Sequence, residues 1–222
     1  MSEEILKALM QLFALIAKQD SGVEDNEIEF VRKFLTSQLN HETVKEYLHL
    51  FYEHAEIDPE NVDKKDRERQ LTSVKDSVKI LGICKKINKR LTQRQKIVVL
   101  VRLFELVNAD QKFTEQRMAI INTVAEVFNI TTEEFKSTEQ FVIENPEKIS
   151  DSNILRINSI GVVEGDECKH IKTTDLDGNI LILQIKSVDL YFLRYSGSAD
   201  ILLNGLPVNS RSIYLFANGS SI

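Results

Sequence analysis

The sequence predicts an α+β protein of two domains, in which an all-helical domain precedes a small, mainly antiparallel β domain. Two observations lead to this prediction. Up to Asn145 and Pro146, apolar residues recur near the 3.6-residue spacing of a helix. After Pro146 the spacing changes to two, and β-branched residues and turn dipeptides replace helix caps. We therefore expect a helical domain over residues 1–146 and a β domain over residues 150–222.

The first domain is expected to contain about seven helices. Helical spacing of apolar residues begins at Ile5 and resumes at Ile28. Side chains that cap helix N-termini precede further helices; the expected caps are Asn40, Asp58, Thr92, Thr114 and Thr131. One further helix is expected to turn an apolar face inward, made of Val74, Val78, Leu81, Cys84, Ile87 and Leu91.

The second domain is expected to be built from short strands joined by tight turns. Asp177-Gly178 predicts a turn before a strand over 179–185, and a further strand is expected over 189–195. Asn204-Gly205 predicts a hairpin that joins 201–203 to 206–208. A last strand is expected over 212–216.

Two similar passages, residues 20–27 and 110–117, organise the helical domain. In each passage an Asp is followed three positions later by an apolar residue and seven positions later by a charged one. These are Asp20, Val23 and Glu27 in the first copy and Asp110, Phe113 and Arg117 in the second. Each passage lies between two helical patterns, so both are interpreted as helix-loop-helix joints.

The same separations occur in calcium-binding EF-hand loops, but neither passage supplies enough oxygen ligands. The first and third ligand places hold Ile16 and Lys18 in one copy. In the other copy they hold Leu106 and Asn108, and Arg117 puts a cation where a bidentate carboxylate belongs. Neither loop alone is therefore expected to bind calcium.

The residues around both joints resemble the helical TerB-like domain of tellurite-resistance proteins, whose joints carry an Asp-Gly-x-apolar-x-x-x-Glu pattern. The resemblance covers about residues 1–145 and is carried by Ala17-Lys-Gln-Asp20, Val23-Glu-Asp-Asn-Glu27 and Val107-Asn-Ala-Asp110. Ser21 and Gln111 replace the glycine, and Arg117 replaces the last acidic residue of the second copy. The resemblance implies the helical fold.

The C-terminal passages Ile201-Leu-Leu-Asn-Gly-Leu-Pro-Val208 and 213–222 resemble the later strands of a forkhead-associated (FHA) domain. A TerB-like domain followed by an FHA-like module resembles the N-terminal cytoplasmic region of bacterial ABC-transporter ATP-binding proteins. These resemblances imply a piece of a longer transport ATPase at the inner face of the membrane. Its expected partners are other domains or subunits of the transporter. The phosphate-binding Gly-x-x-x-x-Gly-Lys-[Ser/Thr] motif does not occur in these 222 residues.

Asp20, Glu27 and Asp110 form the acidic cluster that the two joints would bring together if the repeats pack about a pseudo-two-fold axis. Such a cluster is the candidate site for a divalent metal, and no other cofactor is expected in this chain. The alternative is structural: Asp20 and Asp110 bind loop amides, Glu27 favours a helix N-terminus, and Arg117 pairs with a carboxylate.

Charge is segregated along the chain, although the net charge is only −6. Residues 64–102 carry 13 Lys and Arg against 3 Asp and Glu, whereas residues 1–63 carry 5 against 14. The helix that follows residue 74 is expected to expose a basic face opposite its apolar one, made of Lys75, Lys79, Lys86, Lys89 and Arg90. This face is the candidate contact for an acidic protein or an anionic membrane surface, or it pairs with the acidic ends of the same chain. Nucleic acid is not expected, because aromatic residues do not alternate with the basic ones.

Catalytic signatures are missing from the sequence. Cys84 and Cys168 have no C-x-x-C partner, and the four His residues lack metal-ligand spacing. We expect a non-catalytic cytoplasmic regulatory and interaction module of a membrane transport ATPase, an ABC-transporter ATP-binding protein. The alternative function is a metal- or ligand-sensing TerB-like domain of a stress response.

Overall fold

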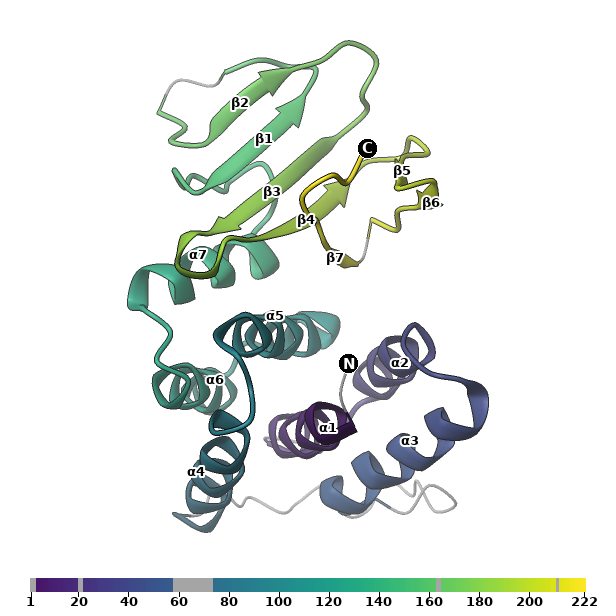
Figure 1. The fold of residues 1–222 in the computed structure, drawn as a ribbon, viewed down its shortest axis with the longest axis vertical. Helices are drawn as coiled ribbons and strands as arrows, with labels where there is room; N and C mark the ends of the chain where they lie inside the picture. Colours follow the sequence, from purple (N-terminus) through teal and green to yellow (C-terminus); the bar gives the residue numbers. More distant parts are fainter. Residues whose placement is uncertain (1–2, 20–21, 58–73, 163–164, 211) are drawn as a thin grey trace. The chain divides into compact units, whose positions relative to one another are not determined.

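A computed structural model describes residues 3–19, 22–57, 74–162, 165–210 and 212–222 (Figure 1). The chain divides into two compact units, Met1–Thr131 and Thr132–Ile222. The first unit contains six of the described helices, and the seventh belongs to the second unit. These helices are α1 Glu3–Ala17, α2 Asp25–Thr36, α3 His41–Ala55, α4 Val74–Asn88, α5 Gln93–Asp110, α6 Glu115–Val127 and α7 Thr132–Ile143.

Helices α1 and α5 form the centre of the first unit. Every residue of 12–17 in α1 and of 103–107 in α5 is buried, so these segments pack on all sides. Helix α1 packs against α3, α4 and α5, and α2 packs against α3 and α5 (Figure 1). Phe13 of α1 contacts the rings of Phe30 and Phe34 of α2 edge-on, at centroid distances of 5.8 and 5.7 Å.

Several predicted helix caps are confirmed. The Asn40 Oδ1 atom accepts from the Thr43 backbone N–H at 3.0 Å. The Thr92 backbone N–H donates to Gln95 Oε1 at 2.9 Å, which forms the predicted capping box of α5. Thr114 caps α6 as predicted. The predicted cap Asp58 lies outside the described residues.

The predicted inward face of α4 needs one correction. Val78 is 62% exposed, whereas Ile80, Cys84 and Ile87 are buried. Two residues correspond to about 200° of rotation around a helix, so burial of Ile80 places Val78 on the opposite side. The prediction was wrong because Val78 and Ile80 offer two alternative apolar faces, and only the packing of α4 against α1 and α6 selects between them.

The described residues of the second unit form a five-stranded mixed sheet and a two-stranded one. The large sheet has the order β2-β1-β3-β4-β7, in which β1 and β2 are parallel and the other pairs antiparallel (Figure 1). The strands are β1 Ile154–Asn158, β2 Lys169–Lys172, β3 Asn179–Ile185, β4 Leu190–Ser196, β5 Leu202–Leu203, β6 Leu206–Pro207 and β7 Ile213–Leu215. The predicted fold class, helices followed by mainly antiparallel strands, is confirmed.

The turn before β3 requires its glycine. Gly178 has a φ of +97°, and a Cβ atom there would lie 1.8 Å from the Ser196 carbonyl oxygen. Only glycine tolerates both the positive φ and this close approach. The second predicted turn, Asn204-Gly205, joins β5 to β6 with φ of 52° and 79°, as in a type I′ hairpin turn.

Helix α7 is part of the second compact unit, where it packs against β3. The Arg194 Nη1 atom of β4 donates to the Phe141 carbonyl at 2.6 Å and to the Glu144 carbonyl at 2.9 Å. These bonds satisfy carbonyls at the C-terminal end of α7 that have no partner within the helix. The compact units therefore divide after Thr131, whereas helix gives way to strand between Ile143 and Ile154. A domain boundary at residues 146–150 stays a prediction.

Candidate functional site

The second helix-loop-helix joint places Arg117 in the first turn of α6. Gln111 ends α5 in the left-handed conformation with a φ of 59°, and Asp110 Oδ1 accepts from the Lys112 backbone N–H at 3.0 Å. The Thr114 cap then starts α6, so that the side chain of Arg117 turns inward and is 1% exposed. An arginine buried to this extent requires partners for its charge.

Arg117 binds groups from both helix-loop-helix joints. Its Nη1 atom lies 2.5 Å from Asp110 Oδ2, and its Nη2 atom lies 3.2 Å from Glu27 Oε1. The Nη2 atom also donates to the Ala17 carbonyl at the end of α1, at 3.3 Å. Both carboxylate side chains are 0% exposed. Arg117, Glu27 and Asp110 are called the inter-repeat cluster below.

The first joint holds Glu27 by a further bond. The Glu24 backbone N–H donates to Glu27 Oε2 at 2.9 Å, at the N-terminus of α2. The side chain of Glu24 forms an ion pair with Lys112 of the second joint. The two joints are thus linked by the buried pair of Glu27 with Arg117 and by the partly exposed pair of Glu24 with Lys112.

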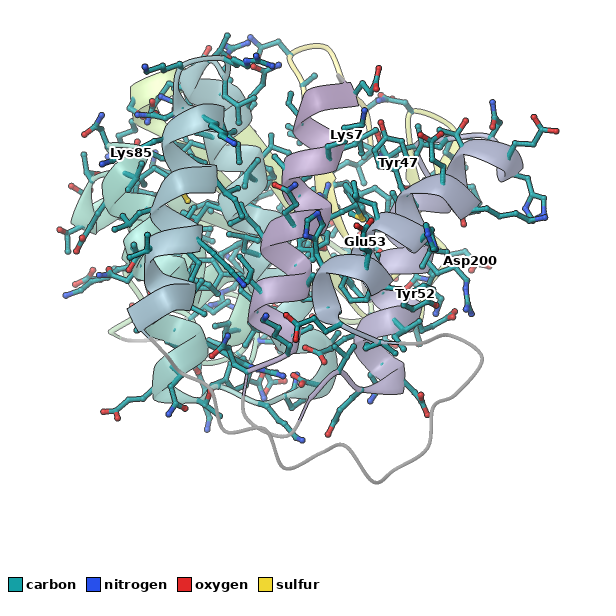
Figure 2. All side chains as sticks on the ribbon, turned by 90° about the horizontal axis from the view of Figure 1, so that it is seen from below. Lys7, Tyr47, Tyr52, Glu53, Lys85 and Asp200 are labelled. Atoms are coloured by element: carbon teal, nitrogen blue, oxygen red, sulfur yellow. The ribbon has the colours of Figure 1, made fainter. Side chains whose placement is uncertain are left out.

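A second candidate site is the exposed side of α4. Ile80, Cys84 and Ile87 are buried, whereas the opposite side exposes basic residues around Val78 and Gly82. We call it the α4 basic surface; it consists of Val78, Lys79, Gly82, Lys85, Lys86, Lys89 and Arg90. Figure 2 shows Lys85 on the side of α4 that faces away from α1.

Comparison with known proteins identifies the helical region. The family model described as tellurite resistance protein TerB matches residues 6–140 of the 222. The chain belongs to the TerB family. No curated protein and no solved structure matches the chain significantly. The TerB match contains both joints, so the inter-repeat cluster and the α4 basic surface lie within the TerB region.

The predicted acidic metal cluster is brought together in part. Glu27 and Asp110 of the TerB region converge, but on the guanidinium of Arg117 rather than on each other. Asp20 lies outside the described residues. Within the described part of the chain, no three His, Cys, Asp or Glu side chains are grouped as a metal site would require. Metal binding by Asp20, Glu27 and Asp110 remains a prediction.

Burial changes the acidity of Glu27. Loss of hydration raises the pKa of this carboxyl from 4.5 to about 7, although Arg117 and the Glu24 backbone N–H both act to lower it. The carboxylate of Asp110 lies closer to the same guanidinium. Its negative charge also acts to raise the pKa of Glu27. The inter-repeat cluster has two carboxylates for one guanidinium, so protonation of Glu27 would neutralise it.

Four residues of the predicted basic face of the TerB region are exposed, and their role as a contact surface stays a prediction. Lys79, Lys86, Lys89 and Arg90 are exposed, while the side chain of Lys75 lies outside the description. The sequence interpretation omitted Lys85, Val78 and Gly82. The spacing Val78, Gly82 and Lys85 could have shown them, because steps of four and three residues follow one side of a helix.

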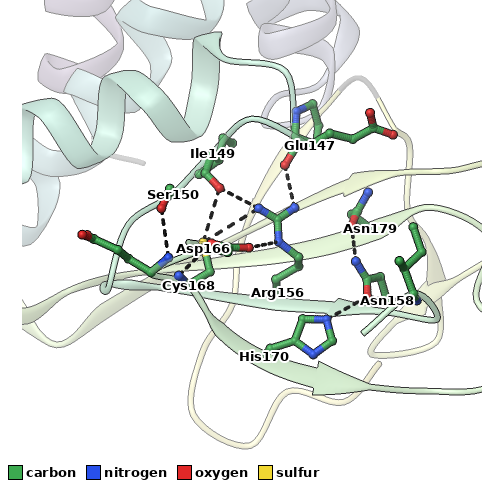
Figure 3. A network of polar contacts seen from close by, with 12 residues as sticks. Glu147, Ile149, Ser150, Arg156, Asn158, Asp166, Cys168, His170 and Asn179 are labelled. Atoms are coloured by element: carbon green, nitrogen blue, oxygen red, sulfur yellow. Dashed lines mark hydrogen bonds and ion pairs between the residues drawn. The ribbon is translucent and has the colours of Figure 1, made fainter. Parts of the chain in front are cut away.

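In the second unit, Arg156 of β1 organises the segment that leads into the sheet (Figure 3). Its Nη1 atom donates to the Pro146 carbonyl at 2.7 Å, and its Nη2 atom donates to the Ile149 carbonyl at 2.6 Å. Its Nε atom lies 3.1 Å from Asp166 Oδ2. Arg156 is only 4% exposed, and these bonds satisfy its buried guanidinium. The network is therefore structural.

Both cysteines are buried thiols, as predicted. Burial raises the pKa of the Cys84 thiol to about 12, and it also raises that of Cys168.

Two of the histidines have polar partners. His54 lies 3.2 Å from Gln11 Nε2, and the Nε2 atom of His170 lies 2.8 Å from Asn158 Oδ1. None of the helices in the described residues has the length and hydrophobicity of a membrane span.

Proposed function

We propose that this chain is a non-catalytic interaction module whose TerB region binds an acidic partner through the α4 basic surface. The partner is another domain or subunit of a membrane transport ATPase, an ABC-transporter ATP-binding protein. The second unit serves as an FHA-like β module of the same protein. The transport ATPase is supported by the order of the two resemblances in the sequence, TerB-like and then FHA-like.

The α4 basic surface is the observation that carries this proposal. Lysines at the C-terminal end of a helix stabilise it through the helix dipole, which explains Lys85 and Lys86 without a partner. Val78 and Lys79 lie in the first half of α4, where that explanation does not hold. The surface therefore combines basic residues along the length of the helix with one exposed apolar side chain, that of Val78, which is 62% exposed.

Site-specific crosslinking in cells tests the proposal. A photoreactive residue placed at Lys85 should capture a specific protein, and the same residue at Lys33, on α2, should not. Charge reversal at Lys86 and Lys89 should abolish the capture and leave the unfolding midpoint unchanged. Equal capture from both positions, or capture that survives charge reversal, would contradict the proposal.

The alternative function, sensing of a metal or ligand, is favoured by one observation. Glu27 and Asp110 come from the two repeats and converge at one buried place. For a metal to bind there, the guanidinium of Arg117 would have to leave two carboxylates and the Ala17 carbonyl. Arg117 therefore favours the interaction module over the sensor.

A further inference from the structure

We infer that the α4 basic surface docks an acidic amphipathic helix of the partner, which packs closely against α4 over Gly82. This inference rests on the proposed function and deepens it, because it specifies the chemistry and the secondary structure of the partner. It follows from the arrangement of Val78, Gly82, Lys85, Lys86 and Lys89.

Three residues form a line along the exposed side of α4. Val78, Gly82 and Lys85 follow one another in steps of four and three residues, and Lys89 comes four residues later, just after the helix ends at Asn88. Such a line is the kind of ridge or groove through which helices pack against each other. Because Gly82 has no side chain, a docked helix would approach the backbone of α4 most closely here, between Val78 and Lys85.

Gly82 has no explanation within the described fold. It lies in the interior of α4, where glycine is less favourable than alanine. A Cβ atom at this position would meet none of the described atoms within 4 Å, and the φ of Gly82 is not in the left-handed region. Neither packing within the unit nor backbone conformation requires a glycine here. A remaining physical reason for a glycine at position 82 is the close approach of another backbone.

The charges and the apolar content of the surface favour an acidic helix over a membrane. Lys85, Lys86 and Lys89 are exposed near Gly82 and complement carboxylates on the flanks of a docked helix. A helix that binds a membrane inserts large apolar side chains such as Trp, Phe or Leu. Val78 is the one apolar side chain that this surface exposes among the described residues of α4, so it offers little to insert.

Binding of a defined peptide tests the inference. The probe is a stapled peptide of about 20 residues, helical in isolation, with an Ala and Leu stripe flanked by Glu. A stapled peptide of the same composition, with the stripe scrambled around the helix, controls for charge alone. The full chain should bind the striped peptide at least about tenfold more tightly than the scrambled one. Equal binding of the two peptides would overturn the inference.

Substitutions at Gly82 separate close packing from charge. Gly82→Ala should raise the thermal midpoint and leave peptide binding within about threefold, because a methyl group fits a close helix contact. Gly82→Gln should also preserve folding but weaken binding by about tenfold or more, because its side chain keeps a docked helix away from the backbone of α4. His49→Gln on the exposed side of α3 is the matched control and should change neither quantity. Unchanged binding by Gly82→Gln would overturn the inference.

Vesicles distinguish failure of this inference from failure of the proposed function. Vesicles with about one-third phosphatidylglycerol should bind the chain weakly, and Gly82→Gln should not affect that binding. Strong vesicle binding without selective peptide binding would overturn the docked helix and assign the surface to lipid. Specific crosslinking at Lys85 together with equal binding of the two peptides would keep the proposed function and remove only the helix. If neither specific crosslinking nor selective peptide binding is observed, both the proposed function and the docked helix are wrong.

Discussion

Arg117 forms its buried ion pair with Glu27, the residue that occupies the same place in the other repeat. Each lies seven positions after the Asp of its joint, in the first turn of the helix that follows. One repeat therefore supplies the anion and the other supplies the cation. Asp110 lies 2.5 Å from the same guanidinium. The positive charge beside the two carboxylates therefore comes from an arginine of the chain and not from a bound metal ion.

The inter-repeat cluster is expected to be essential for stability. Arg117→Met removes the guanidinium and leaves Glu27 and Asp110 buried without it, which should cost about 3–5 kcal/mol of unfolding free energy. Urea denaturation at pH 7.5 measures this loss. The exposed Arg32→Met on α2 is the matched control and should change stability by no more than about 0.5 kcal/mol. Similar effects of the two substitutions would show that the cluster contributes nothing specific.

Calcium should bind the chain no more tightly than the weakest protein sites, in the range of about 0.1–1 mM or above. The positive charge of Arg117 lies between the carboxylates that would form the site and repels a second cation. Calorimetry with calcium, magnesium and manganese measures the affinity. Micromolar binding that Asp110→Asn or Asp20→Ala abolishes would show that the cluster opens to admit a metal.

Local patterns made part of this fold predictable. Helix caps such as Asn40 and Thr92 act within four residues of themselves, and the turn at Asn204-Gly205 depends on the two residues that form it. These features are therefore visible in the sequence. The same holds for β3, whose continuous apolar run is buried along most of its length.

Features decided by distant partners were not predictable in the same way. The inward face of α4 depends on packing, so Val78 was assigned to the wrong side. Strand β2, with the sequence Lys-His-Ile-Lys, has the polarity of a loop and is a strand because it pairs in parallel with β1. Arg117 could be recognised as a possible partner for a carboxylate, but its contact with the other repeat is a property of the tertiary fold.

The unfolding free energy should depend on the protonation of Glu27. Its folded pKa is about 7 and its ordinary value is 4.5, so the folded state holds this proton to a higher pH than the unfolded chain does. Stability should therefore fall as pH rises from about 4.5 to about 7, by at most about 3 kcal/mol from this group. Denaturation of the wild type and Glu27→Gln across this range isolates the contribution.

The substitution should remove the part of the pH dependence that Glu27 causes. The matched control is Glu29→Gln, on the exposed side of α2, which should leave the pH profile of the wild type unchanged. If Glu27→Gln and the wild type show parallel profiles between pH 4.5 and 7, Arg117 holds Glu27 ionised throughout, and the raised pKa is wrong.

The segment between α7 and β1 should resist proteolysis, although it lies where helix gives way to strand. Ile149 is only 2% exposed, and the carbonyls of Pro146 and Ile149 accept from Arg156. Arg156→Gln removes these donors, so the endoproteinase Lys-C should cut after the exposed Lys148 at least about tenfold faster than in the wild type. Thr174→Ala, at an exposed position of the same unit, should leave the cleavage rate unchanged. Rapid cleavage at Lys148 in the wild type would show that the Arg156 network does not hold this segment in solution.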